Sequence, residues 1–532
     1  MRAEPITVTL ACLLLAGFHG CAPVTRTFVS TSGAGGGAAS GAGGTGGTLQ
    51  GKGGGGSDGG SGLTPPFASG TRLHAFVEDA SGGAVALEYW QDQLLGLSCS
   101  FLPTTDGNIH CVPVSANTLG YSDASCSTKV GLVSACGAAS GYIVDQPPQQ
   151  CRGNPLATLA VPPVTTYALG AKLGVGVVYT LDDATPPSCT VASKSEAYYA
   201  ITVADPSTFV SATLVKEPRD SRLDAEVLHG SDGSSQLTGQ VYDTSMGDLP
   251  CSLDFAGSTS DPTYVCIPGG VATLDSTNPQ YDDSACTIPI ANEPAYSACP
   301  TANVVIQDAV PASACSLGSH TYTHVGTDVT AGNVCTPGTT APCTCKTDTS
   351  GTHYFTLGAT IDASTFATFT AAKFGTGRVQ TVYLADAAGV QLAGAQPDSF
   401  WDSMAAASCT LDTFTDGSVR CVPETTLSVY RSDSPVYQDA ACTLQLATQY
   451  VNGSCTTAAP TTVVTIQQAS GACGGQTVTA VNSLGPELAS ATIYQKIGTS
   501  CAPEAVPSGT IYFPFAAALD SSAFGLVVAK AE

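Results

Sequence analysis

The cysteines have the most obvious chemistry in this sequence. The chain holds 22 of them, and 20 remain when Cys12 and Cys21, which lie in an N-terminal apolar stretch, are set aside. An even number of cysteines in an exported chain is typical of disulfide bonds. Taking neighbours along the chain as partners, we predict nine bonds: Cys99–Cys111, Cys126–Cys136, Cys151–Cys189, Cys251–Cys266, Cys286–Cys299, Cys315–Cys335, Cys409–Cys421, Cys442–Cys455 and Cys473–Cys501.

A metal site is the competing interpretation. Cys343 and Cys345, together with His320, His324 and His353, form the one unusual cluster of metal-ligating residue types. Zinc sites usually pair Cys or His at short spacing, and no C-x-x-C occurs here. His320 and His324 lie in a segment typical of a strand, which would separate them by about 13 Å. We therefore predict solvated histidines and no metal, with Cys343 and Cys345 bonded to each other or stapling a loop.

Arginine and aspartate recur three times in the chain. The arginines are spaced by 150 and 156 residues, and an aromatic residue and an aspartate follow each of them. The sets are Arg72 with Trp90 and Asp92, Arg222 with Tyr242 and Asp243, and Arg378 with Trp401 and Asp402. A catalytic site needs one asymmetric arrangement, so a triplicated set favours a structural role. We predict one buried ion pair beside an aromatic ring in each repeat.

A tyrosine and an aspartate also recur, in YSDASC, YDDSAC and YQDAAC. The pairs are Tyr121 with Asp123, Tyr281 with Asp283, and Tyr437 with Asp439. These aspartates could cap a turn or hold calcium, and capping is the simpler prediction. No G-x-S-x-G, H-E-x-x-H, Walker or EF-hand motif is present, so the sequence indicates no catalytic residue and no cofactor other than calcium as an alternative.

The elements that position these residues belong to a repeated body. Matching segments begin TRLHAFVEDASGG at Thr71, SRLDAEVLHGSDG at Ser221 and GRVQTVYLADAAG at Gly377, and about ten positions then agree in order. Alternating apolar residues and Asp-Gly turn signals predict short strands. We expect an all-β fold of three repeats, with boundaries at 67–219, 220–375 and 376–532.

A fainter half-repeat within each unit predicts six four-stranded blades of a β-propeller. An apolar strand precedes the second and third repeats, FVSATLV at Phe209 and FATFTAA at Phe366, but is missing before the first. Its counterpart is FGLVVAK at Phe524, near the C-terminus. We therefore expect the C-terminal strand to close the ring. Three separate β-sandwich domains are the alternative.

Charge and the N-terminal segment place the body outside the cytoplasm. Asp and Glu total 42 against 18 Lys and Arg, which argues against nucleic acid and anionic lipid headgroups as partners. Residues 1–21 have the layout of a signal peptide. Residues 22–66 form a Gly/Ser-rich linker that cannot bury enough surface to fold.

The sequence Gly20-Cys21 at the end of the signal resembles the lipobox of bacterial lipoproteins, although Phe18 and His19 differ from the usual pattern. The resemblance implies lipidation of Cys21, and Ala22 after it implies the outer membrane. The Gly-rich linker is similar in style to lipoproteins of predatory and social soil bacteria. We expect a non-enzymatic binding or scaffold protein anchored in the cell envelope, with an unknown protein or glycan as its ligand. A glycan-active hydrolase or lyase and a calcium-stabilised envelope component are the alternatives.

Overall fold

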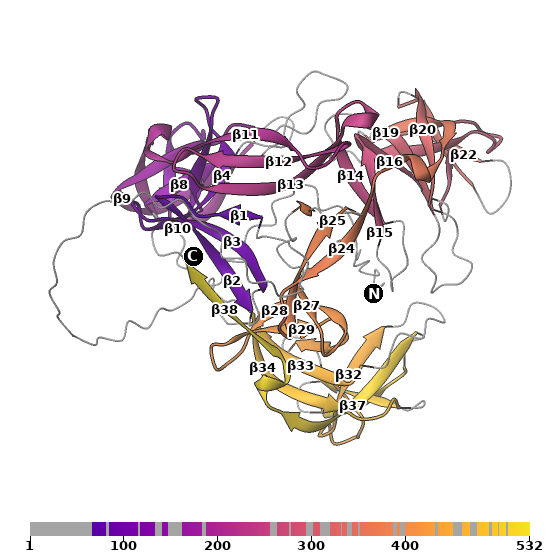
Figure 1. Ribbon diagram of the computed structural model, residues 1–532. Coiled ribbons are helices and arrows are strands. Elements are labelled where there is room, and N and C mark those ends of the chain that lie inside the picture. The colour runs from indigo at the N-terminus through magenta and orange to yellow at the C-terminus, as the bar shows by residue number, and fades with distance from the viewer. Residues whose placement is uncertain are drawn as a thin grey trace.

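The fold is all-β (Figure 1). The computed structural model describes residues 66–80, 84–114, 117–133, 141–146, 162–182, 188–255, 263–275, 278–293, 302–308, 320–330, 332–337, 343–348, 352–386, 391–393, 400–430, 435–450, 460–468, 476–488, 492–497, 500–506 and 509–531. Over these ranges the chain forms strands and short 3-10 turns but no α-helix. The predicted signal peptide, Cys21 and all of the linker before residue 66 lie outside the described residues.

One 17-stranded sheet contains strands from all three repeats, and we call it the shared sheet. The first repeat contributes β1 (Phe67–Ala68), β2 (Leu73–Ala80), β3 (Ala84–Asp92), β4 (Leu97–Pro103) and β5 (Ile109–Pro113). A second set follows as β11 (Ser211–Pro218), β12 (Leu223–Gly230), β13 (Ser235–Asp243), β14 (Leu249–Phe255) and β15 (Thr263–Pro268). The remaining strands are β24 (Thr368–Phe374), β25 (Val379–Ala385), β26 (Gln391–Ala393), β27 (Phe400–Asp402), β28 (Ala407–Thr413), β29 (Val419–Pro423) and β38 (Gly525–Ala531).

Three antiparallel strand pairings, which we call the seams, join these sets of strands to one another. In the first seam β11 pairs with β5, in the second β24 pairs with β15, and in the third β38 pairs with β29. Strand β38 also pairs with β2, as β11 pairs with β12 and β24 with β25. The C-terminal strand therefore takes the place that the first repeat leaves open. Pairing across the seams also links the repeats by hydrogen bonds that separate sandwich domains would lack.

The strands outside the shared sheet form three smaller sheets, which we call the lobes (Figure 1). The first lobe has five strands, β6 (Thr118–Tyr121), β7 (Lys129–Leu132), β8 (Tyr142–Asp145), β9 (Thr165–Asp182) and β10 (Ser188–Val203). The second has eight, β16 (Gly270–Leu274), β17 (Gln280–Tyr281), β18 (Pro289–Glu293), β19 (Ala302–Asp308), β20 (His320–Asp328), β21 (Asn333–Thr336), β22 (Thr344–Thr347) and β23 (His353–Ile361). The third also has eight, β30 (Leu427–Tyr430), β31 (Val436–Tyr437), β32 (Gln445–Tyr450), β33 (Thr462–Gln468), β34 (Gln476–Leu484), β35 (Ile493–Ile497), β36 (Ser500–Glu504) and β37 (Thr510–Leu519).

The six four-stranded blades of a propeller are not confirmed. Each repeat divides its strands between the shared sheet and its own lobe, and the sheets do not form closed barrels. The half-repeat signal in the sequence has a simpler origin, because strands of both kinds of sheet alternate apolar and polar residues in the same way.

Each seam is entered through the same short motif, which the sequence analysis missed. A 3-10 turn precedes β11, β24 and β38, and the turns are η1 (Pro206–Thr208), η3 (Ala363–Thr365) and η4 (Ser521–Ala523). The aspartate before each turn accepts a hydrogen bond from a serine N–H two residues on, and the phenylalanine after it is buried. The motif is D-x-S-x-F, with Asp205 and Phe209, Asp362 and Phe366, and Asp520 and Phe524. A fourth 3-10 turn, η2 (Thr244–Met246), follows β13.

The disulfides of the shared sheet are confirmed. Cys99–Cys111, Cys251–Cys266 and Cys409–Cys421 are present, and each joins two adjacent antiparallel strands diagonally. Cys99 lies opposite Pro113, while Cys111 lies opposite Phe101. The short loops between these cysteines brought sequence neighbours together, which is why pairing by order along the chain succeeded.

The predicted pairings in the lobes are wrong. Cys126–Cys189, Cys286–Cys343 and Cys442–Cys501 span 63, 57 and 59 residues, and Cys335 bonds Cys345. Each long bond joins the YSDASC-type turn to a strand or its approach late in the lobe, at β10, β22 or β36. Several strands intervene in the chain, so the nearest cysteine in sequence is not the nearest in space. The partners predicted for these cysteines, Cys136, Cys151, Cys299, Cys315, Cys455 and Cys473, lie outside the described residues.

Candidate functional site

The three predicted arginine–aspartate pairs are present. Arg72–Asp92, Arg222–Asp243 and Arg378–Asp402 have N···O distances of 2.7, 2.5 and 2.8 Å, and the aspartate side chains are at most 1% exposed. The aspartates also accept N–H groups from the turn that follows, as Asp92 does from Leu94 and Leu95. Arg72 further donates to the carbonyl of Thr208, in the turn that enters the first seam. The pairs therefore stabilise the places where the sets of strands in the shared sheet meet.

The aromatic partners were aligned wrongly in the first repeat. Asp92, Asp243 and Asp402 occupy one register position, opposite Leu73, Leu223 and Val379. Gln91 therefore corresponds to Tyr242 and Trp401, whereas Trp90 lies one residue earlier and is 2% exposed. Tyr242 and Trp401 lie beneath Lys216 and Lys373, with nitrogen-to-ring distances of 3.7 and 3.3 Å. The rings form cation–π contacts there, and Trp90 packs in the core instead.

The repeated tyrosine–aspartate turns are capped as predicted. Asp123 accepts hydrogen bonds from the N–H groups of Ser125, Ser127 and Thr128. Hydrogen bonds, first of all from the side chain of Ser125, hold the pKa of Asp123 well below its usual range. Asp283 and Asp439 are bonded in the same way, to Thr287 and Thr443. A calcium ion would have to compete with these N–H donors for the same oxygens.

The unusual histidine and cysteine cluster is not brought together. Cys343 and Cys345 belong to different disulfides. His320 bonds Asp254 at 2.7 Å, and His353 lies 3.5 Å from the hydroxyl of Thr330. Within the described ranges no group of three or more His, Cys, Asp or Glu could hold a metal ion.

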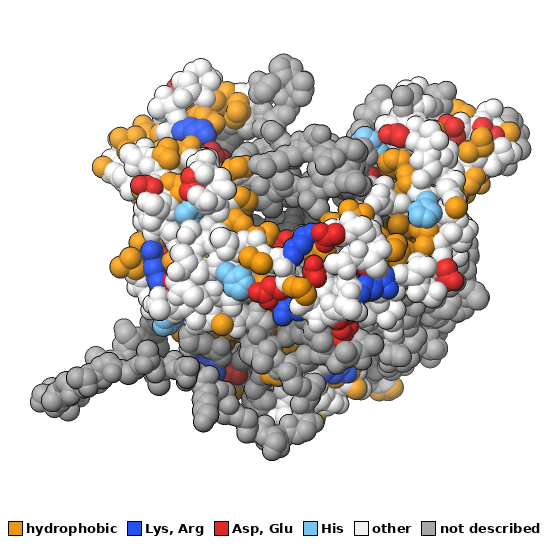
Figure 2. Space-filling model, turned by 45° about the horizontal axis from the view of Figure 1, so that its top comes forward, with side chains coloured by type: hydrophobic (Ala, Val, Ile, Leu, Met, Phe, Trp, Pro, Cys, Tyr) orange, Lys and Arg blue, Asp and Glu red, His pale blue; other side chains and the backbone are white. Residues whose placement is uncertain are grey.

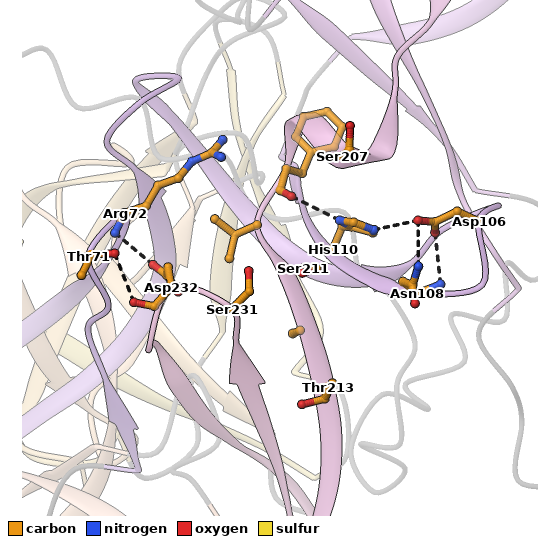
Figure 3. A pocket seen from close by; sticks show the side chains of 13 residues that line it. Thr71, Arg72, Asp106, Asn108, His110, Ser207, Ser211, Thr213, Ser231 and Asp232 are labelled. Atoms are coloured by element: carbon orange, nitrogen blue, oxygen red, sulfur yellow. Dashed lines mark hydrogen bonds and ion pairs between the residues drawn. The ribbon is translucent and has the colours of Figure 1, made fainter.

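A cavity of about 690 Å³ lies at the first seam and joins the first repeat to the second. Figure 3 shows Thr71, Arg72 and Asp232 on one side and Asp106, Asn108 and His110 on the other, with serine side chains between them. The walls come from the approach to β2, the β4–β5 turn with β5, the η1 turn with β11, and the β12–β13 turn. Segments far apart in sequence thus build one site.

Asp106 organises one wall of the cavity. Its carboxylate accepts the hydroxyl of Thr104 at 2.6 Å, the side-chain amide of Asn108 at 3.0 Å and Nε2 of His110 at 3.0 Å. Hydrogen bonds from Thr104 and Asn108 are the main reason that the pKa of Asp106 lies well below its usual range. Nδ1 of His110 lies 3.3 Å from the carbonyl oxygen of Phe209. The histidine therefore ties this wall to the segment just before β11.

Asp232 organises the opposite wall. It accepts the N–H groups of Arg72 at 3.0 Å and Leu73 at 2.6 Å, and the hydroxyl of Ser234 at 2.7 Å. Burial acts to raise the pKa of Asp232, but hydrogen bonds from Leu73, Ser234 and Arg72 outweigh it and hold the pKa below its ordinary value. A Cβ on Gly70 would overlap this carboxylate, so only glycine permits the approach.

Several polar groups of the cavity are uncommitted. The hydroxyls of Ser211, Thr213 and Ser231 make no hydrogen bond with any described residue, whereas the Ser207 side chain bonds Asp205. Nη1 of Arg72 also lacks a described partner, because Nε and Nη2 make all the side-chain bonds. The cavity thus combines carboxylates that already accept hydrogen bonds from the protein with hydroxyls that are free to bind a ligand.

The third seam has the same strand pairing but different side chains at this place. Arg420 takes the place of His110, and its guanidinium donates to the carbonyl of Phe524 at 3.2 Å and to the hydroxyl of Ser418 at 2.9 Å. Asp416 accepts the hydroxyl of Ser521 across the seam. Leu526 lies where the first seam has Ser211.

The second seam has Val265 in the same place, packed against Ile267 and Phe366. Of the residues that line this cavity, the sequence indicated a role only for Arg72, while Thr71 and Phe209 marked the starts of repeated segments. The available signal was the residue before the cysteine of CVP or CIP, which is His110, Val265 or Arg420 in the three repeats. A position that varies within an otherwise shared motif marks where the repeats differ in chemistry.

The surface offers no competing charged patch on the face shown in Figure 2, where acidic and basic side chains lie intermixed. Among the described residues, Lys216 pairs with Asp248 and Arg219 pairs with Glu217. In the part of the chain that the structure describes, no helix is long and apolar enough to cross a membrane.

Comparison with protein families matches residues 66–452 to a family described as "Family of unknown function (DUF7481)". No curated protein and no solved structure shows a significant match to the chain.

Proposed function

The chain belongs to this family of unknown function (DUF7481), and we propose that it is an exported, envelope-anchored binding protein whose ligand enters the seam cavity. The anchor in this proposal is a lipid on Cys21, followed by the linker over 22–66. The body is a disulfide-stapled β structure that serves as a binding surface or scaffold and not as an enzyme. In the same proposal the circuit of seams is a ring that the C-terminal strand closes.

Export is supported by the cysteines. Seven disulfides lie within the described residues. Such bonds persist in oxidising compartments and are rare in the cytosol, where thiols are kept reduced.

Binding without catalysis is supported by the state of the cavity carboxylates, and this observation carries the proposal. Hydrolysis of a glycosidic bond needs one carboxyl group that stays protonated to act as an acid. Asp106 and Asp232 are the two acidic residues in the lining of the cavity, and they lie on opposite sides of it (Figure 3). Their carboxylate oxygens already accept hydrogen bonds from the protein, and the pKa of each aspartate lies below its ordinary value. Neither is suited to donate a proton.

The test uses the full chain carrying Cys21→Ser, so that no lipid anchor takes it into the pellet. This chain is produced under oxidising conditions and mixed with isolated cell-envelope fragments. We expect the protein to sediment with the fragments and to release no reducing sugar during prolonged incubation. A double variant, Ser211→Leu with Thr213→Val, replaces two of the free hydroxyls by the apolar residues that the third seam has there, Leu526 and Val528, and should stay in the supernatant.

The matched control is Thr368→Leu with Thr370→Val, which makes similar changes at exposed positions of the second seam. It should sediment like the unchanged protein. Turnover of the envelope material would favour the hydrolase, and equal sedimentation of both double variants would contradict a role for the cavity.

The anchor is tested separately by replacing Cys21 with serine. The unchanged chain should partition into detergent with the membrane fraction, and the Cys21→Ser variant should be released. Retention of the variant in the detergent phase would contradict lipid anchoring through this residue.

A further inference from the structure

The uncommitted groups of the seam cavity indicate what class of ligand it takes. We propose that the cavity binds a neutral saccharide of one or two sugar rings, an inference that rests on the proposed binding function. It depends on three properties of the cavity, which are its free hydroxyls, its charge and its size.

Hydroxyls dominate the free hydrogen-bonding capacity. Ser211 and Thr213 lie on β11, and Ser231 lies in the β12–β13 turn. Each hydroxyl can both donate and accept, as can each hydroxyl of a sugar. The side-chain oxygen of Asn108 adds an acceptor, since the amide nitrogen is engaged by Asp106. Such a set suits a ligand that presents hydroxyls on several sides.

The charges around the cavity disfavour an anionic ligand. Arg72 is the one arginine in the lining, and Asp92 pairs with it in a two-bond contact. Asp106 and Asp232 contribute two further negative charges close by. A phosphate, sulfate or carboxylate would therefore enter a site of net negative potential, within a chain whose formal charge is −24.

The same carboxylates are poorly placed for a cation. Asp106 and Asp232 each accept several hydrogen bonds from the protein, so their oxygens have few lone pairs left for an ammonium group. What remains for the ligand is neutral hydrogen bonding, with one donor from Nη1 of Arg72.

Size and surface complete the argument. A volume of about 690 Å³ falls within the range of about 300–1,000 Å³ that small-molecule sites occupy. The aromatic ring among the lining residues belongs to Phe209, which is 3% exposed and packs in the core. The cavity therefore offers a flat apolar or aromatic ligand little to stack on.

The experiment measures binding of the full chain to six disaccharides by calorimetry. Maltose, lactose, cellobiose and N,N′-diacetylchitobiose are the neutral probes, digalacturonic acid is the acidic probe, and the glucosamine disaccharide is the basic probe. We expect at least one neutral probe to bind, and the charged probes to bind at least tenfold more weakly. The Ser211→Leu/Thr213→Val variant should weaken neutral binding at least tenfold, and Thr368→Leu/Thr370→Val should leave it unchanged.

Three outcomes would overturn the inference. These are binding of none of the six probes, preference for a charged probe, and neutral binding that the cavity variant leaves intact. The proposed function has its own readout, which is sedimentation with envelope fragments and its loss in the cavity variant. That result does not depend on how the six probes behave. The saccharide class would then be wrong while the binding role remained.

Discussion

The first and third seams of the shared sheet have the same backbone and different chemistry. In both, a buried phenylalanine follows a capped 3-10 turn, and a disulfide with a separation of 12 residues staples the neighbouring strands. The ion pairs at their joints are also alike, at 2.7 and 2.8 Å. The seams differ where side chains face the space between strands, with His110 and Ser211 in one and Arg420 and Leu526 in the other.

The comparison separates two kinds of residue. Residues present in both seams have a structural role. Each one pairs a buried charge, caps a turn or links two strands, and every repeat needs these contacts. Residues that differ give each seam its own chemistry. In the third seam Arg420 spans from Ser418 to the carbonyl of Phe524, whereas the shorter His110 and the small Ser211 leave a cavity.

The largest expected effect concerns the joint that both seams share. Arg72→Ala and Arg378→Ala should each lower the free energy of unfolding by about 3 kcal/mol, because each leaves a buried aspartate without its partner. Denaturant unfolding of both variants measures this. The comparison predicts similar losses, so a large loss at one seam and none at the other would break it. A charge-swapped Arg378→Asp/Asp402→Arg variant should be more stable than Arg378→Ala; equal instability would count against the pairing.

The shared disulfides should come next. Removing Cys99–Cys111 or Cys409–Cys421 by paired serine substitutions should cost about 3 kcal/mol each, because both bonds close loops of the same length in the unfolded chain. Thermal unfolding of the two variants under identical oxidising conditions checks the equality. A loss confined to one bond would mean that the two seams are not mechanically equivalent.

The residues that differ should have smaller and unequal effects. Arg420→Ala removes a charged hydrogen bond to the Phe524 carbonyl and should cost about 1.5 kcal/mol. His110→Ala removes a 3.3 Å contact to the Phe209 carbonyl and a 3.0 Å bond to the partly exposed Asp106 carboxylate, and should cost about 1 kcal/mol. Denaturant unfolding again gives both values. A larger cost at His110 would show that the first seam depends on this side chain for stability.

The smallest effect for a single residue concerns acid. Hydrogen bonds hold the pKa values of Asp106 and Asp416 below the ordinary value, with Thr104 and Ser418 as the first donors. A carboxyl group with a lowered folded-state pKa contributes stability above its unfolded pKa of about 4, and that contribution is lost as the pH falls. Melting temperatures should therefore be level near neutrality and fall below about pH 4. Asp106→Asn and Asp416→Asn should each make the fall slightly shallower; an unchanged acid profile in both would contradict this assignment.

Part of the fold was predictable because its signals are local. The arginine–aspartate pairs, the disulfides of the shared sheet and the capped turns recur with nearly constant spacing, and strand alternation fixed the all-β class. The position of the C-terminal strand followed from counting which repeat lacked its first strand. The alignment of Trp90 failed because the strand pairing, and not the distance to the aspartate in sequence, decides which residue faces the core.

The lobe disulfides and the cavity were not predictable in this way. Cys126 bonds a cysteine 63 residues away, after the chain has formed several strands. The wall of the cavity joins His110 to Phe209 across 99 residues and Arg72 to Asp232 across 160. No local pattern reports contacts at such separations.

By itself the sequence determined the repeated all-β body, its capped turns and its short-range disulfides, because each is specified by residues close together in the chain. Only the tertiary structure decided that the first seam holds a cavity and which hydroxyls line it. That outcome depends on side-chain volume and hydrogen bonds between strands of different repeats, and these exist only once the seams have formed.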